Sequence, residues 1–143
     1  MRFAVLVKAD ERTEAGELPS EQELRDMGNF NDELVKAGIM LAGEGLTDSS
    51  KGVRIRYEGG RKSVIDGPFA EAKELVAGFW ILEAKSKEEV IEWMKRAPFQ
   101  SGEIEIRPIF EADDFGENLT PELRAQEDRQ RETMKARQEA AKG

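Results

Sequence analysis

The first 110 residues combine short apolar runs with longer stretches in which apolar residues recur every three or four positions. Short runs rich in β-forming residues predict strands, and they lie at residues 3–7, 39–42 and 78–82. Alternating apolar and polar residues predict further strands, a half-buried one at 53–57, its partner at 63–65 and a last one around 104–107. The pair Gly59-Gly60 predicts a hairpin with a type I′ turn, because glycine supplies the positive φ angles that this turn needs.

Two helices are expected after serine caps. Ser20 with Glu23, and Ser86 with Glu89, fit the capping box, in which two side chains reciprocally satisfy free backbone amides. Gly38 is placed to end the first helix, and Pro98 forbids much continuation of the second. The apolar face of the first helix, which we interpret as core packing, comprises Leu24, Met27, Phe30, Leu34 and Val35.

The order of these elements is strand, helix, strand, hairpin, strand, helix, strand. It predicts an α+β domain of the ferredoxin-like type, a split β-α-β arrangement with an inserted β-hairpin, over residues 1–110. Both helices should pack on one face of an antiparallel sheet. Nothing else in this stretch is left to cover the other face, so we expect a second copy of the chain to cover it in a homodimer.

Residues 111–143 have a different composition and are expected to form a polar C-terminal helical extension. Thr120 followed by Pro121 is a good helix start. Residues 123–141 contain strong helix formers but little apolar face. Because a helix this polar is marginal by itself in water, we expect it to project or to lie across a partner subunit.

Composition narrows the chemistry. The chain of 143 residues has 22 basic and 30 acidic side chains, a net charge of −8, which argues against a nucleic-acid partner. It has no run approaching the ~20 apolar residues of a membrane span and no signal-peptide pattern, so we expect a cytoplasmic protein without membrane contact. Without Cys or His, disulfides, thiolate nucleophiles, His-based zinc or haem sites and the Ser-His-Asp triad are excluded, and we expect no metal and no cofactor.

The stretch from Val64 to Glu74, which contains Asp66-Gly67-Pro68-Phe69, resembles the DGPF subgroup of the YCII-related (YciI-like) family. Further matching pieces follow in the expected order, at residues 30–34, 43–46, 77–79, 92–93 and 105–108. The resemblance covers residues 1–109 and implies a dimeric α/β barrel that places a small, often cyclic or aromatic molecule between sheet and helices. Some YciI-like members carry a His-Asp pair proposed as catalytic, but this chain has no His. DGPF-type proteins are also often encoded beside sigma factors.

Two carboxylates are candidate catalytic groups. Asp66 stands where a strand ends in a turn, so it is either a cap for the turn's amides, with Gly67 in a conformation that other residues resist, or a general acid or base. Glu44 lies between Gly43 and Gly45, where a ligand or another backbone can approach closely. If both faced one cavity, burial and repulsion would raise the pKa of one of them. The alternative for Glu44 is a surface carboxylate paired with an Arg.

Five further residues are candidate substrate contacts. Phe69, Met27 and Phe79 are expected to line the pocket. Lys73 and Arg107 could neutralise a substrate carboxylate, although for Lys73 we favour a solvated turn with an ion pair. The basic residues of the hairpin suggest a solvated face or salt bridges to another subunit more than an anion site, and they are Arg54, Arg56, Arg61 and Lys62.

These residues support two main hypotheses for function. The first is a cofactor-independent small-molecule enzyme in which Asp66, with Glu44, moves a proton in an isomerisation or elimination. The alternative is a non-catalytic metabolite-binding or protein-interaction module, linked to sigma-factor regulation. In a third hypothesis the polar tail helix docks on another protein.

Overall fold

The structure is a computed structural model of the chain, and it describes residues 1–142. The chain divides into two compact units, residues 1–109 and the residues from Phe110 onward. Within the described residues, no helix is both long enough and apolar enough to cross a membrane.

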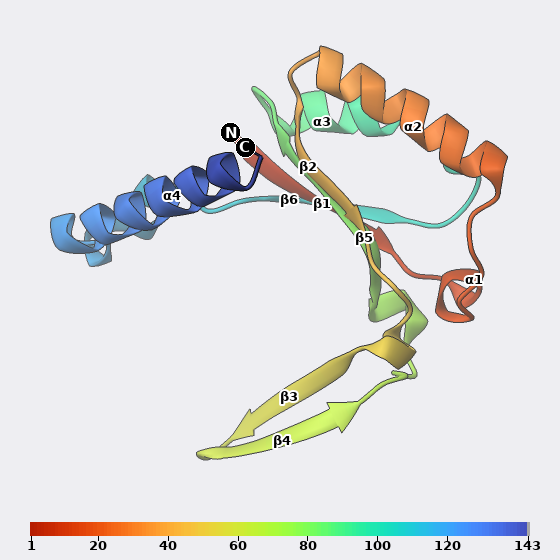
Figure 1. Cartoon of the computed structure of the whole chain (residues 1–143), viewed down its shortest axis with the longest axis horizontal. Coiled ribbons are helices and arrows are strands. Elements are labelled where there is room, and N and C mark those ends of the chain that lie inside the picture. Colours follow the sequence, from red (N-terminus) through yellow and green to blue (C-terminus); the bar gives the residue numbers. More distant parts are fainter. Residues whose placement is uncertain (143) are drawn as a thin grey trace. The chain divides into compact units, whose positions relative to one another are not determined.

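The first unit is built on a four-stranded antiparallel sheet with the strand order β2-β5-β1-β6 (Figure 1). Its strands are β1 (Arg2–Lys8), β2 (Met40–Gly45), β5 (Val76–Glu83) and β6 (Ile104–Pro108). The helix α2 (Glu21–Lys36) connects β1 to β2, and α3 (Lys87–Met94) connects β5 to β6. This confirms the α+β ferredoxin-like arrangement that the sequence predicts.

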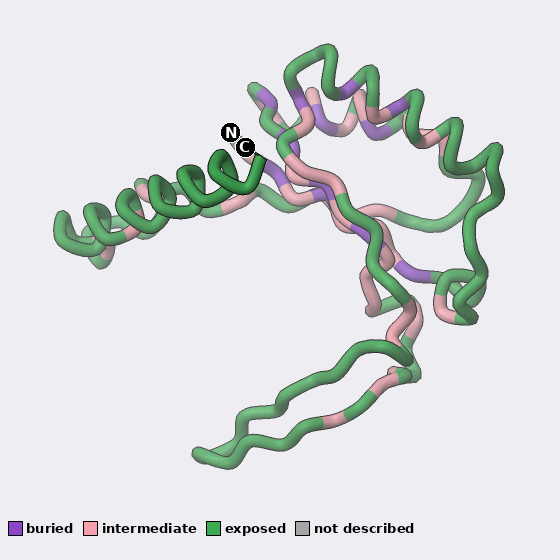
Figure 2. Tube along the Cα trace, viewed as in Figure 1, coloured by how far each residue is buried: buried purple, intermediate pink, exposed green. Residues whose placement is uncertain are grey.

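Both helices lie on one face of the sheet (Figure 1). Strand alternation buries Phe3 and Val5 of β1 completely and leaves Ala4 and Leu6 half-buried on the other face (Figure 2). The open face of the sheet therefore remains uncovered by the helices. The hydrophobic core lies between sheet and helices and consists of Phe3, Val5, Phe30, Leu34, Ile39, Trp80, Leu82, Ala84, Val90 and Met94.

The predicted capping box of α2 is confirmed. In α3 only the hydrogen bond to the Ser86 side chain is formed, so the predicted reciprocal bond from the Ser86 amide to Glu89 is wrong. Ser20 Oγ accepts from the Glu23 amide at 3.1 Å, and Glu23 Oε1 accepts from the Ser20 amide at 3.5 Å. Ser86 Oγ likewise caps the Glu89 amide at 3.2 Å, but the Glu89 carboxylate accepts from the Lys85 amide, one residue too early for a box.

The polar loop expected between β1 and α2 contains one helical turn, α1 (Glu11–Glu14). Asp10 Oδ1 accepts from the Thr13 amide at 2.8 Å, and Thr13 Oγ1 accepts from the Asp10 amide at 2.9 Å. The signal for this turn was present in the sequence as a reciprocal Asp and Thr pair three residues apart.

The inserted hairpin consists of β3 (Val53–Glu58) and β4 (Arg61–Asp66), which pair with each other in a separate two-stranded sheet. Gly59 and Gly60 have φ angles of 53° and 85°, as the predicted turn requires. The expectation that the first hairpin strand is half-buried is wrong, because all six residues of β3 are exposed. No described part of the chain packs on it closely enough to bury it.

The second unit contains a 3-10 segment, Ala112–Asn118, and the helix α4 (Pro121–Lys142). Thr120 Oγ1 accepts from the Leu123 amide at 3.3 Å and starts the helix. The rings of Phe110 and Phe115 stack with centroids 4.9 Å apart. No residue of α4 is buried, which agrees with the polar composition of this helix.

Candidate functional site

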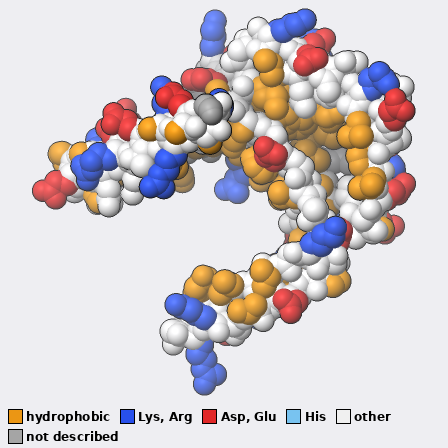
Figure 3. Space-filling view, in the orientation of Figure 1, with side chains coloured by type: hydrophobic (Ala, Val, Ile, Leu, Met, Phe, Trp, Pro, Cys, Tyr) orange, Lys and Arg blue, Asp and Glu red, His pale blue; other side chains and the backbone are white. Residues whose placement is uncertain are grey.

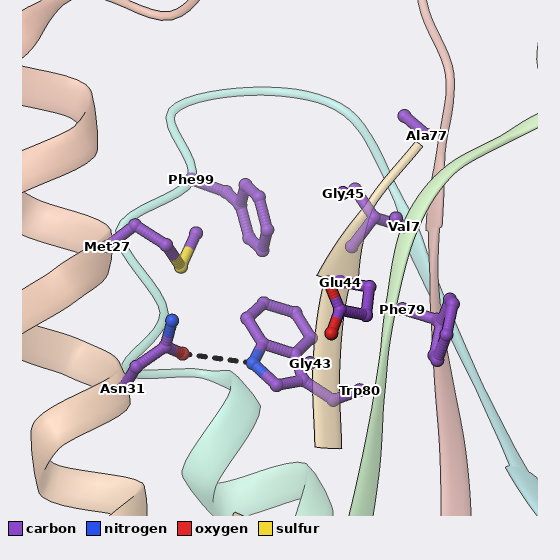
Figure 4. Close-up of a pocket in the computed structure, with 11 residues that line it drawn as sticks. Val7, Met27, Asn31, Gly43, Glu44, Gly45, Ala77, Phe79, Trp80 and Phe99 are labelled. Carbon is purple, nitrogen blue, oxygen red and sulfur yellow. Dashed lines mark hydrogen bonds between the residues drawn. The ribbon is translucent and has the colours of Figure 1, made fainter. Parts of the chain in front are cut away.

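A pocket of about 240 Å³ opens between α2, the loop that follows α3 and the ends of β2 and β5 (Figure 4). Most of its lining is apolar or aromatic. The residues that line it are Val7, Met27, Asn31, Gly43, Glu44, Gly45, Ala77, Gly78, Phe79, Trp80 and Phe99.

Trp80 is the central side chain of this pocket. Its indole Nε1 donates to Asn31 Oδ1 on α2 at 3.0 Å (Figure 4), which satisfies the one polar atom of a nearly buried ring. The ring also packs edge-on against Phe30 and Phe99, with centroids 6.2 Å and 6.1 Å apart. These contacts hold the indole in one orientation, so it forms a rigid wall.

The glycines of β2 explain why there is space beside the indole. A Cβ at Gly43 would lie 2.5 Å from Met40 Cε and 3.1 Å from Trp80 Cδ1, so Trp80 packs directly on the backbone there. A Cβ at Gly45 would meet nothing within 4 Å. Gly45 pairs with Gly78, on the helix-facing side of the sheet. Gly43, Gly45 and Gly78 have no side chains, which leaves space on this face beside the indole.

Glu44 borders the pocket from the other side of the sheet. It pairs with Phe79 across β2 and β5, and strand alternation puts both on the face opposite to Trp80. Figure 4 shows the Phe79 ring across β5 from the indole. Among the lining residues, Glu44 is the one ionisable side chain, and its carboxylate makes no hydrogen bond or ion pair with the described residues.

The other candidate carboxylate lies elsewhere. Asp66 is the last residue of β4 and is exposed, and its carboxylate makes no hydrogen bond or ion pair within residues 1–142. Phe69 does not line the pocket either, because its ring lies under the Arg54 guanidinium, 3.8 Å from centroid to Cζ. The pocket thus contains Met27, Phe79 and Glu44 of the expected residues, and it does not contain Asp66 or Phe69.

The turn from Asp66 to Phe69 anchors the hairpin. Ser49 Oγ accepts from the Phe69 amide and Gly52 O accepts from the Gly67 amide, each at 3.0 Å. The Glu14 carboxylate in turn accepts from the Ser49 amide at 3.0 Å and from the Ser49 hydroxyl. These groups satisfy the turn, and Asp66 caps none of its amides.

The expected reason for Gly67 is wrong. Its φ angle is not positive, so an L residue could adopt its backbone conformation. A Cβ at this position would instead lie 1.7 Å from the backbone oxygen of Ser49. Gly67 is required because two backbone segments approach each other closely at the base of the hairpin.

Asp48 sits beside this anchor. A hydrogen bond from the Ser50 hydroxyl lowers the pKa of the Asp48 carboxyl below its ordinary value. The stabilisation from this interaction is therefore present above the carboxyl's unfolded pKa and is lost as the pH falls through the lowered value.

The two candidate cations also lie outside the pocket. Lys73 is exposed in the 3-10 turn Ala72–Glu74, and the ion pair expected for it is absent from the described residues. Arg107 on β6 is exposed, with its Nε 3.8 Å from the Glu105 carboxylate. In addition, residues 1–142 contain no group of three or more metal-ligating side chains.

Sequence reasoning missed six lining residues, which are Val7, Asn31, Ala77, Gly78, Trp80 and Phe99. Trp80 and Val7 were recognisable as strand residues, but an apolar strand position does not reveal an adjoining pocket. The one usable signal was Trp80 itself, because a buried indole needs an acceptor for its N–H. That Asn31 supplies the acceptor depends on how α2 packs.

Comparison with known proteins gives three findings. The family model that matches the chain describes the YCII-related domain and spans residues 1–113. The uncharacterized protein R00369 of Rhizobium meliloti (strain 1021) is 30% identical over 114 residues, 76% of this chain and 92% of the relative. A solved structure of 5-chloro-2-hydroxyhydroquinone dehydrochlorinase (TftG) from Burkholderia phenoliruptrix AC1100, in complex with 2,5-dihydroxybenzoquinone, matches with a TM-score of 0.35 and 15% identity over 73% of this chain and 91% of that chain. This last likeness is too distant to indicate an activity.

Proposed function

Because the chain belongs to the YCII-related domain family, we propose that it binds a small, uncharged and largely apolar organic molecule beside Trp80. The motif from Asp66 to Phe69 supports membership of the DGPF subgroup. The observation that carries the proposed function is the pocket itself, which has aromatic walls and one free carboxylate at its border.

The size of the pocket limits the ligand. Its volume of about 240 Å³ is below the roughly 300–1,000 Å³ that is usual for drug-sized ligands. An apolar cavity of about 150 Å³ is sufficient for benzene. The pocket therefore suits a single ring with few substituents.

The chemistry of the walls favours a neutral ring. Met27, Trp80 and Phe99 offer thioether and aromatic contacts, which favour a planar apolar partner. No Lys or Arg is among the lining residues, so an anionic group would lose its hydration without gaining a counter-ion. In a single chain, Lys73 and Arg107 lie outside the pocket and cannot supply this counter-ion.

The binding proposal is tested with tryptophan fluorescence. Trp93 stacks against Arg96 outside the pocket, so a Trp93→Phe variant leaves Trp80 as the one tryptophan reporter. Benzyl alcohol should change its emission and raise the melting temperature of the protein. Benzoate, which has a similar ring but a charge, should bind at least about tenfold more weakly.

A matched pair of variants locates the binding site. In the Trp93→Phe background, Gly45→Leu should fold and abolish the response to benzyl alcohol, because the new side chain fills open space in the pocket. Gly28→Ala, on α2 with nothing within 4 Å of the new methyl, should bind as before. An unchanged response in the Gly45→Leu variant would place the ligand elsewhere.

A second candidate function is acid–base catalysis at Glu44, without a cofactor. The observation that favours it is that Glu44 is the one ionisable lining residue and has no partner in the described chain. A free carboxylate can take a proton from a bound molecule and return it at another atom, as an isomerisation requires. Because the side chain of Glu44 lies on the face opposite to Trp80, that molecule would lie at the open face of the sheet, beside Phe79. Asp66 lies off the pocket, so in one chain this role falls to Glu44.

Glu44→Gln separates catalysis from binding. The amide keeps the shape of the side chain but cannot act as a base, so turnover of any substrate found in a ligand screen should fall by about 100-fold or more. The affinity for benzyl alcohol should stay within about twofold, because the amide side chain has nearly the same shape. Product formation at the wild-type rate in this variant would exclude the catalytic role.

We further propose that the protein is a homodimer in which the open faces of two sheets pack together as an α/β barrel. Ala4, Leu6, Phe79 and Ile81 are apolar residues on that face, and the helices of the same chain do not cover it. A second copy would remove these residues from water, with each patch facing its own counterpart.

A further inference from the structure

The hairpin has an apolar face that the chain leaves in water. Ile55 pairs with Val64, and directly paired residues lie on the same side of a two-stranded sheet. Val53 and Tyr57, two positions from Ile55 in each direction, share this side. Their partners Asp66 and Lys62 lie at its two ends. The four side chains are exposed to 56% (Val53), 51% (Ile55), 70% (Tyr57) and 69% (Val64), and Figure 3 shows hydrophobic side chains along the hairpin.

The opposite face is mostly polar and basic, with the half-buried Ile65 beside Arg54 as its apolar residue. Arg56 pairs with Ser63, and Glu58 pairs with Arg61 at the turn. Arg56 Nε lies 3.8 Å from the Glu58 carboxylate. The two faces therefore differ in chemistry, although both are exposed in the single chain.

This separation indicates a partner for the apolar face. An isolated two-stranded hairpin is at best marginally stable in water, and every residue of β3 is exposed. The base is nevertheless held by Ser49, Gly52 and the ring of Phe69 under Arg54. A hairpin with an anchored base and an uncovered apolar face is typical of an arm, that is, an extension that packs on another protein chain.

Charge identifies the partner. Residues 53–66 carry four basic and two acidic side chains, a net charge of +2. Because the whole chain carries −8, the remaining residues carry −10. The hairpin is thus a basic element in an acidic protein, and a second copy of the same chain is a partner of opposite net charge.

We propose that the hairpin is an arm whose apolar face, Val53, Ile55, Tyr57 and Val64, packs on a second copy of this chain. The inference rests on the homodimer proposed above and adds a second contact region to it. In a two-fold dimer each chain gives one arm and receives one, so every contact of the arm occurs twice.

The test compares two double variants at neighbouring positions of the hairpin. Ile55→Thr with Val64→Thr makes the apolar face polar and keeps β-branched residues that suit a strand. Arg56→Lys with Ser63→Thr changes the opposite face and keeps its charge. Both pairs are cross-strand neighbours in the same hairpin, so their effects on the hairpin itself are comparable.

Sedimentation velocity and hydrogen exchange, each over a range of protein concentrations, give the two readouts. In the wild type, amides of residues 53–66 should exchange at least about tenfold more slowly in the dimer than at dilutions where it dissociates. The apolar-face variant should lose this protection and dimerise at least about tenfold more weakly. The opposite-face variant should match the wild type in both measurements.

The possible outcomes distinguish a failure of the proposed hairpin contact from a failure of the proposed dimer. A wild-type dimer whose hairpin amides exchange as fast as in the monomer would overturn the arm and leave the dimer in place. Hairpin protection that does not depend on protein concentration would also overturn it. A wild-type protein that stays monomeric at every concentration would overturn both the dimer and the arm. The proposed ligand binding is tested independently, by the change in Trp80 emission on addition of benzyl alcohol.

Discussion

Replacing Ile81 with Asp should abolish the proposed dimer and leave a folded monomer. Ile81 lies on the open face of the sheet, paired with Ala4 and Ala42, and the adjacent Leu82 is fully buried in the core. A carboxylate at Ile81 would leave the core intact and would be desolvated in the dimer, once in each copy. Two such groups cost on the order of 3 kcal/mol or more, which weakens dimerisation about 100-fold.

The measurement is sedimentation equilibrium with circular dichroism on the same sample. Val35→Asp is the matched control, because Val35 is an exposed apolar residue on α2, away from the open face. That variant should dimerise like the wild type. If Ile81→Asp remained dimeric, or if both variants dissociated equally, the packing of two open sheet faces would be refuted.

Replacing Gly67 with Ala should detach the base of the hairpin. The added methyl would stand 1.7 Å from the Ser49 backbone oxygen, and backbone cannot yield as a flexible side-chain tip can. The strand end must shift, which breaks the bonds from the Gly67 amide to Gly52 and from the Phe69 amide to Ser49. Overpacking together with two lost hydrogen bonds should destabilise this region by roughly 3 kcal/mol.

Hydrogen exchange of the amides of Gly52, Gly67 and Phe69 checks this result. Gly28→Ala is the control for a glycine with free space. Because alanine is the better helix former, this change should stabilise the protein by about 0.5–1 kcal/mol. Protection of the hairpin base that survived Gly67→Ala would show that the close approach to Ser49 does not need glycine.

These two results would change how the DGPF motif is understood in this chain. Its Gly67 and Phe69 bind the hairpin base to Ser49 and Arg54, and the pocket is formed by other residues. If the hairpin is an arm, the motif supports assembly. The proposed catalytic role would then depend on Glu44, which lies outside the motif.

Features that depend on neighbouring residues could be predicted from the sequence. The Ser20 cap, the Gly59-Gly60 turn and the periodicity of α2 involve residues a few positions apart, whose preferences act locally. The expected apolar face of α2 was too wide, because Leu24 and Val35 are exposed. The order of elements then limited the topology to a ferredoxin-like sheet. The single turn of α1 was missed, although its Asp10 and Thr13 signal is equally local.

The site could be predicted only in part. Met27, Phe79 and Glu44 lie on the elements that border the pocket, and the packing of these elements follows from the fold. Asp66 and Phe69 do not, since the hairpin takes them to its own base. Alternation correctly predicted the strand at Val53–Glu58, but burial depends on what covers a strand, and this chain does not cover it.

The amino-acid order by itself determined the kind and sequence of the elements, the absence of thiol and imidazole chemistry, and one sheet face without a cover. Tertiary structure decided that Asn31 meets Trp80 across 49 positions and that Ser49 meets Phe69 across 20. Such contacts form where packed elements bring distant side chains together. Local preferences extend over a few residues, whereas the shape of a pocket depends on how whole helices and strands fill space.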